Sequence, residues 1–66
     1  MKNTYVAIAT FGSYEDKDYA IIYAGQFEEE AERACKNFVF PNEDNNYAGY
    51  EIWEDGKQIG YKQVID

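Results

Sequence analysis

Cys35 is the strongest candidate nucleophile in this 66-residue sequence, which contains one cysteine and no histidine. A catalytic thiol needs a neighbouring base or positive charge that lowers its pKa. Cys35 instead belongs to the apolar side of a helical pattern, where a thiol is usually buried and unreactive. The sequence therefore predicts no nucleophilic catalysis at this residue.

The thirteen aspartates and glutamates are the other groups that could do chemistry, as a paired acid and base. Such a pair needs a cleft that raises the pKa of one carboxyl group. A chain of 66 residues is close to the lower size limit for independent folding and has little room for a deep cleft. We therefore expect no enzymatic activity and no cofactor.

One segment follows the spacing of a calcium-binding loop in part. The first, third, sixth and twelfth positions of that spacing are Asp44, Asn46, Gly49 and Asp55. Ala48 stands at the fifth position, where a ligand is needed, and Asp55 belongs to a hairpin turn. The sequence favours an ordinary loop without a metal, and cation binding by residues 42–49 is the alternative.

The elements that must position these groups begin with two strands. Residues 4–11 (TYVAIATF) and 18–25 (DYAIIYAG) are rich in β-branched and aromatic residues and are separated by a polar segment, GSYEDK. This arrangement predicts an antiparallel hairpin. Neither face of these strands is plainly polar, and we expect Val6 and Ile8 to face the core.

A helix is predicted from about residue 27 to residue 38. Its apolar stripe gathers five core candidates: Phe27, Ala31, Ala34, Cys35 and Phe38. Acidic residues in the first turn stabilise the positive end of the helix dipole. We also expect ion pairs of Glu29 with Arg33 and of Glu32 with Lys36, because each pair is four residues apart.

The dipeptide Asp55-Gly56 predicts a two-residue type I′ turn between two further strands. The expected register pairs Glu54 with Lys57, Trp53 with Gln58, Ile52 with Ile59, Glu51 with Gly60 and Tyr50 with Tyr61. It places Ile52, Ile59, Tyr50 and Tyr61 on one side of the sheet, and Trp53, Glu51, Lys62 and Tyr47 on the other.

These elements predict a single domain, residues 1–66, with the order β-β-α-β-β. We expect an α+β fold of two layers, in which one helix covers one face of a four-stranded antiparallel sheet. The predicted core consists of Val6, Ile8, Ile22, Ala31, Ala34, Phe38, Ile52 and Ile59. The other face of the sheet stays open, with Trp53 at least partly accessible on it.

The formal charge of −7 restricts the partners of this domain. Such a charge repels nucleic acid and anionic membranes, and we expect neither to be bound directly. A lone cysteine fits a reducing compartment, which makes the cytoplasm the default location. No segment has the long apolar run of a membrane span or of a signal peptide.

Many acidic residues lie outside the helix, where stabilisation of the helix dipole cannot explain them. An array of carboxylates can imitate the phosphates of DNA and occupy a basic DNA-binding surface. On this hypothesis each carboxylate replaces a phosphate for an arginine or lysine of the target. The predicted partner-binding residues are Glu15, Asp16, Asp18, Glu28, Glu32, Glu51, Trp53, Glu54 and Asp55.

Four features of the chain occur together: the short length, the charge, the lone helix FEEEAERACKNF and the mixed acidic and aromatic segment NYAGYEIWEDG. Through these features the chain resembles a group of phage proteins. It resembles the small acidic anti-CRISPR proteins and, as second choice, the uracil-DNA glycosylase inhibitors. The resemblance implies an inhibitor that mimics DNA and blocks a basic protein of a host defence or repair system. The target would be the DNA site or the adjacent-motif (PAM) site of a CRISPR surveillance complex, inside a bacterial host.

The alternative hypothesis is a protein-interaction or dimerisation module that uses a tyrosine-rich open sheet face. The sequence contains seven tyrosines and one tryptophan, and these residue types are enriched in the centres of protein interfaces. Both a monomer and a homodimer are compatible with this alternative. The two hypotheses differ in salt dependence, because a charge-driven interaction weakens as salt is added.

Overall fold

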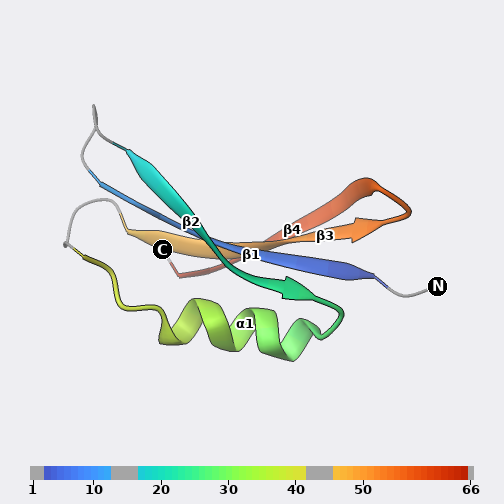
Figure 1. Ribbon diagram of the computed structural model, residues 1–66, viewed down its shortest axis with the longest axis horizontal. Coiled ribbons are helices and arrows are strands. Elements are labelled where there is room, and N and C mark those ends of the chain that lie inside the picture. Colours follow the sequence, from blue (N-terminus) through green and yellow to red (C-terminus); the bar gives the residue numbers. More distant parts are fainter. Residues whose placement is uncertain (1–2, 13–16, 42–45, 66) are drawn as a thin grey trace.

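The described part of the protein forms one antiparallel sheet with a single helix beside it (Figure 1). The computed structural model describes residues 3–12, 17–41 and 46–65. Its elements are β1 (Thr4–Phe11), β2 (Asp18–Gly25), α1 (Glu28–Asn37), β3 (Tyr47–Glu54) and β4 (Lys57–Ile65), and the strand order is β2-β1-β3-β4. The predicted two-layer α+β fold and the order β-β-α-β-β are confirmed.

The helix α1 is one residue shorter at each end than predicted. Phe27 is the N-cap and has an extended backbone, and its carbonyl oxygen accepts the N–H groups of Glu30 and Ala31 at 3.1 and 3.2 Å. No side chain caps this end of the helix, but three glutamates in the first turn complement its dipole. Phe27 is 69% exposed, so its assignment to the apolar helix stripe was wrong, because the chain is still extended there.

The buried core between α1 and the sheet is made mostly of small side chains. Its fully buried members are Ala7, Ala9, Ala31, Cys35, Ala48 and Tyr50. Small residues on both layers allow the helix to lie close to the sheet. Tyr50 is the largest side chain that is fully buried in the part of the chain that the structure describes.

The core prediction was right for Ala31 of α1 and wrong for β1. Ala31 is buried, whereas Ala34 is half-buried. Val6 and Ile8 are also half-buried, and it is Ala7 and Ala9 of β1 that contact the helix. Both faces of β1 are apolar, so its periodicity could not distinguish the side that packs against the helix.

The larger apolar residues surround this core and are half-buried. Ile22, Phe38 and Ile52 were predicted to be buried, and each packs against the edge of the core. Phe38 stacks on Phe11, with 6.0 Å between ring centroids, and meets Phe40 edge-on at 4.9 Å. The segment after α1 thus folds back under β1 and closes this end of the core.

The β3–β4 hairpin has the predicted turn but not the whole predicted register. Asp55 and Gly56 have positive φ angles of 51° and 79°, as a type I′ turn requires. Glu54 pairs with Lys57 and Trp53 with Gln58, as expected, but Ile52 then pairs with Gly60. The extra residue on β4 is Ile59, which is 55% exposed and outside the core.

This β-bulge shifts the next pairs of the hairpin, from Ile52–Gly60 to Gly49–Gln63, by one residue. Tyr61 now lies opposite Glu51, and Lys62 lies opposite the buried Tyr50. Because side chains alternate between the two faces, Tyr61 points away from α1 and Lys62 toward it, the reverse of the prediction. The sequence has no marker for the bulge, since Ile59 fits a regular strand as well as a bulged one.

Candidate functional site: the open face of the sheet

The open face is the side of the sheet that points away from α1. Alternation along each strand and the pairing between strands define its residues. They are Thr4, Val6, Ile8, Thr10, Tyr19, Ile21, Ala24, Tyr47, Gly49, Glu51, Trp53, Gln58, Tyr61 and Gln63. In the part of the chain that the structure describes, α1 is the only helix, and it covers the opposite side (Figure 1).

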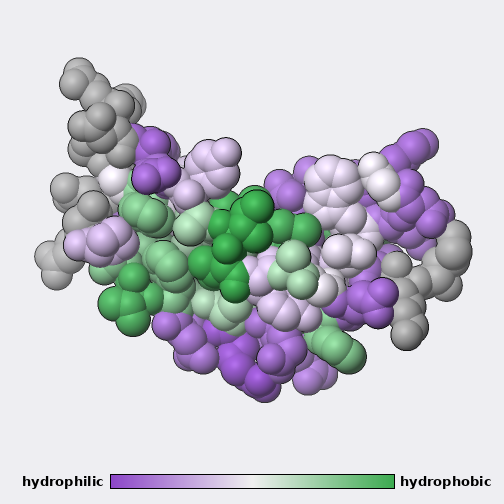
Figure 2. Space-filling view, viewed as in Figure 1, coloured by the Kyte–Doolittle hydropathy of each residue, from purple (hydrophilic) through white to green (hydrophobic). Residues whose placement is uncertain are grey.

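Large apolar and aromatic side chains are exposed on this face. Tyr19, Ile21 and Tyr61 are 69%, 63% and 49% exposed, and Tyr47 and Trp53 are half-buried. Figure 2, in which the β2 edge of the sheet faces the viewer, shows hydrophobic residues above the strongly hydrophilic surface of α1. A surface with several exposed rings and aliphatic side chains is typical of a protein-interaction site.

Glu51 is the carboxylate in the middle of this face. It lies opposite Val6 of β1 and opposite Tyr61 of β4. The indole Nε1 of Trp53 donates a hydrogen bond to Glu51 Oε1 at 3.0 Å. This bond fixes two of the predicted partner-binding residues, Glu51 and Trp53, relative to each other.

The ring of Tyr61 leans across Gly49. A β-carbon built on Gly49 would lie 2.3 Å from the phenolic oxygen of Tyr61, so only glycine leaves room for the ring. Burial raises the pKa of the Tyr61 phenol, and the neighbouring Cys35, Tyr47 and Glu51 raise it further. The phenol is therefore neutral at pH 7 and able to donate a hydrogen bond.

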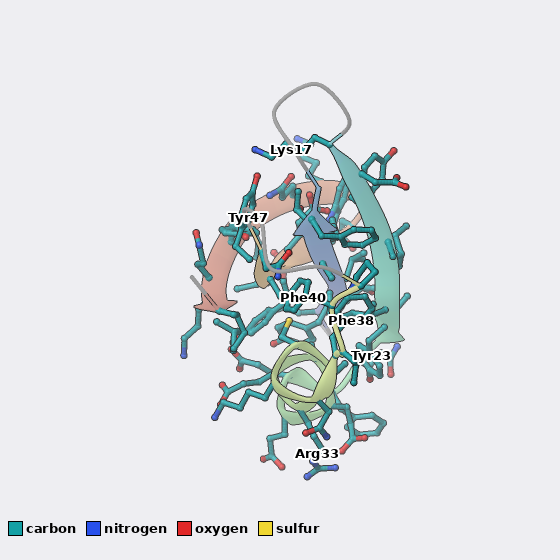
Figure 3. The ribbon with its side chains drawn as sticks, turned by 90° about the vertical axis from the view of Figure 1, so that its left-hand side faces the viewer. Lys17, Tyr23, Arg33, Phe38, Phe40 and Tyr47 are labelled. Carbon is teal, nitrogen blue, oxygen red and sulfur yellow. The ribbon has the colours of Figure 1, made fainter. Side chains whose placement is uncertain are left out.

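A positive charge already lies over one aromatic ring of the open face. The ammonium Nζ of Lys17 is 5.1 Å from the centroid of the Tyr47 ring, a cation–π geometry. Figure 3 shows both side chains on the side of the sheet opposite α1, whereas Tyr23, Phe38 and Phe40 lie between the sheet and the helix. The Tyr47 ring on the open face thus already has a cation of the same chain, Lys17, as its neighbour.

The predicted carboxylates at the sheet ends are far apart. Glu15 and Asp16 lie outside the described residues. Asp18 pairs with Phe11 at one end of β1, while Trp53, next to Glu54 and Asp55, pairs with Thr4 at the other end. Seven residue steps of an extended strand separate these ends by roughly 23 Å.

The predicted carboxylates of α1 belong to the other layer and already have partners. Glu28 Oε2 accepts a hydrogen bond from the phenol of Tyr50 at 2.7 Å. Glu32 forms the expected ion pair with Lys36, at 3.0 Å, and this lysine is the main reason why the pKa of Glu32 is lowered. Arg33 pairs with Glu30 rather than with the predicted Glu29. The structure therefore does not gather the predicted carboxylates on one surface.

No metal or small-molecule site stands out among the described residues. They contain no group of three Cys, Asp or Glu side chains that could hold a metal ion. In the calcium-loop alternative, Asp44 lies outside the described residues, and the whole of β3 separates Asn46 from Asp55. Nine extended residues span roughly 30 Å, so Asn46 and Asp55 cannot bind one ion. A hollow at the start of α1 is lined by consecutive residues 26–30 and is the surface of the helix end.

Glu51 and Trp53, two of the predicted partner-binding residues, lie on the open face, but the prediction did not include the residues around them. Tyr61 was placed on the wrong face because of the unpredicted bulge at Ile59. Tyr19 and Ile21 could have been found only by knowing which side of β2 the helix covers. Cys35 was correctly expected to be buried, and burial raises the pKa of its thiol.

No protein-family model matches the chain, and neither a curated protein nor a solved structure matches it. Among the described residues, no helix is long and apolar enough to cross a membrane.

Proposed function

We propose that this chain is a small protein-binding module whose open sheet face docks on a basic partner protein in the cytoplasm. The observation that carries the proposal is the exposure of Tyr19, Ile21 and Tyr61 on a face that α1 does not cover. Burying these side chains against a partner removes apolar surface from water. Tyrosine and tryptophan are also the side chains that contribute most often to the centres of protein interfaces.

The charge of the chain selects the kind of partner. At −7, a second copy or a nucleic acid is repelled, whereas a positively charged protein is attracted over long range. Acidic residues stand at both ends of the sheet, with Asp18 at one end and Glu54 and Asp55 at the other. Lys17 and Lys57 lie beside these residues, so it is the net charge of the whole chain that favours a partner with a basic rim.

Docking on the face is better supported than docking along a sheet edge. An exposed edge strand can pair with a strand of another protein, but β-bulges interrupt such pairing. The edge strand β2 carries an extra residue at Ile22, and β4 carries extra residues at Ile59 and Val64. Both edges are thus irregular, while the face between them is uncovered.

Two matched variants test the docking face. Ile21→Ser removes an exposed aliphatic side chain from the open face, and Val39→Ser removes one that is 86% exposed and lies after α1, outside that face. A photo-crosslinking residue at position 21 first identifies the partner in the source cells. The affinity of the purified partner is then measured for the wild type and both variants by calorimetry.

We expect Ile21→Ser to weaken binding about tenfold or more and Val39→Ser less than about twofold, because only Ile21 lies in the proposed interface. Both variants should unfold at nearly the wild-type temperature. Equal effects of the two substitutions on affinity would contradict the proposal.

The second candidate function is mimicry of DNA, which the net charge of −7 favours. In this case Asp18, Glu54 and Asp55 would replace phosphates on a basic DNA-binding protein of a host defence or repair system. A duplex as long as β1, roughly 23 Å, carries about 14 phosphate charges at one per 1.7 Å. The carboxylates described here are much sparser, and for that reason we rank mimicry second.

Competition with labelled DNA separates the two candidates. The assay measures DNA occupancy of a CRISPR surveillance complex or a uracil-DNA glycosylase at low and at high salt. Mimicry predicts that the chain displaces DNA, that added salt weakens the effect, and that reversing Asp18, Glu54 and Asp55 together weakens it at least about tenfold. Inhibition that leaves DNA occupancy unchanged would rule mimicry out.

A further inference from the structure

We propose that Glu51, Trp53 and Tyr61 form a binding site for an arginine side chain of the partner protein, an inference that rests on the proposed function. The three residues are adjacent on the open face. Tyr61 lies directly opposite Glu51 across the β3–β4 pair, and Trp53 is two residues further along β3 on the same side. Side chains opposite each other in such a pair are about 5 Å apart at their β-carbons.

The geometry places a carboxylate between two aromatic groups. The Tyr61 ring leans toward Gly49, on one side of Glu51, and the Trp53 indole lies on the other side. Only Oε1 of Glu51 receives the indole hydrogen bond, and no described side chain donates to Oε2. A carboxylate accepts several hydrogen bonds, so Glu51 can still bind a donor from outside the chain.

Lys17 is one example of a cation on this face. Its ammonium group lies over Tyr47, which is on the same side of β3 as Glu51 and Trp53. Tyr47 and Gly49 lie on the same side of β3, and the Tyr61 ring leans across Gly49, so Tyr47 and Tyr61 belong to the same face. The net charge of −7 adds a long-range attraction for any cationic group.

Arginine fits this site better than lysine. Its planar guanidinium group is weakly hydrated, stacks on aromatic rings and donates two parallel hydrogen bonds to a carboxylate. Trp53 and Tyr61 offer aromatic surface, and Glu51 offers the carboxylate. A lysine ammonium group would use the carboxylate but lose most of the stacking.

The experiment titrates the intact protein with three capped tripeptides whose central residue is arginine, lysine or the neutral isostere citrulline. Salt is added to keep the ionic strength equal. The readout is the Nε1–H nuclear magnetic resonance signal of Trp53, which is the only tryptophan of the chain. We expect the arginine peptide to shift this signal saturably in the millimolar range, the lysine peptide to bind about threefold more weakly, and the citrulline peptide to have no effect.

Two variants with the same change in charge locate the site. Glu51→Gln keeps the acceptor oxygen for the Trp53 indole but removes the negative charge, whereas Glu29→Gln removes a charge from the exposed surface of α1. We expect Glu51→Gln to weaken binding of the arginine peptide about fivefold and Glu29→Gln less than about twofold. Equal weakening by both variants would mean general attraction to an acidic protein and would overturn the proposal.

Other outcomes are equally decisive. Equal affinity for the arginine and lysine peptides would overturn the guanidinium site. Concentration-dependent dimerisation that Ile21→Ser abolishes would make a second copy the occupant and overturn the proposal as well. If no peptide binds but Ile21→Ser still weakens partner binding, the arginine site is lost and the docking face remains. If the peptide binds as expected but partner binding is insensitive to Ile21→Ser, the proposed function fails instead.

Discussion

The phenolic oxygen of Tyr61 occupies the space that a side chain at position 49 would need, 2.3 Å from a β-carbon built on Gly49. The backbone carbonyl of Lys62 is also close, at 2.7 Å from the same point. The Tyr61 side chain can rotate away, but the backbone of β4 cannot move without disturbing the sheet. Gly49 therefore determines both the position of Tyr61 and the close approach of β3 and β4.

Gly49→Ala should destabilise the fold because the added methyl group meets this backbone carbonyl. Overpacking of this kind costs about 1 to 3 kcal/mol in the free energy of unfolding. Gly60→Ala is the matched control, since a β-carbon there meets Ile52 Cδ1 at an ordinary 3.4 Å. Urea unfolding followed by circular dichroism measures both variants. A Gly60→Ala variant as unstable as Gly49→Ala would contradict this account of the strand pair.

Phe38→Ala should cost about 2 to 3 kcal/mol, less than the loss of a fully buried phenylalanine. Phe38 is half-buried and contacts both Phe11 and Phe40 through its ring. The neighbouring Val39 is 86% exposed, so Val39→Ala should change the unfolding free energy by less than about 0.5 kcal/mol. Thermal unfolding of the two variants tests the difference, and similar melting temperatures would exclude the aromatic cluster as a source of stability.

Stability should fall as the pH rises above about 10, the ordinary pKa of a tyrosine. Burial raises the pKa of Tyr50, and its hydrogen bond to Glu28 raises it further, so the folded state holds the proton more tightly than the unfolded state. The contribution is complete below the unfolded pKa and is lost as the pH increases beyond it. The slope for one such proton is at most about 1.4 kcal/mol per pH unit.

Tyr50→Phe isolates the contribution of Tyr50 to this pH dependence. The variant lacks the proton and the hydrogen bond to Glu28, so it should be less stable at pH 7 by about 1 kcal/mol and less sensitive to pH above 10. Chemical denaturation at a series of pH values measures both effects. An unchanged slope would assign the alkaline loss of stability to other groups, among them Tyr61, whose pKa is also raised.

Cys35 should react with a thiol reagent only when the protein unfolds. Its side chain is 1% exposed, and burial raises its pKa, so both access and the thiolate fraction are low. For a small domain with a few kcal/mol of stability, we expect the folded protein to react at least about 100-fold more slowly than the protein in denaturant. Comparable rates in both conditions would show that the contact between α1 and the sheet opens readily.

Local sequence patterns were sufficient where neighbouring residues determine the structure. Asp55-Gly56 specifies a turn with two positive φ angles, and the backbone at that point has them. The spacing of Ala31 and Cys35 correctly predicted the side of α1 that is buried. The charge of −7 and the order of the elements also follow from the sequence alone.

The tertiary structure alone decided which residues make up the open face. Val6 and Ile8 are as apolar as Ala7 and Ala9, so alternation along β1 could not indicate which pair would contact the helix. The close approach of α1 favours the small alanines there. The bulge at Ile59 moved Tyr61 beside Glu51, because pairing between strands depends on long-range packing that no local pattern records.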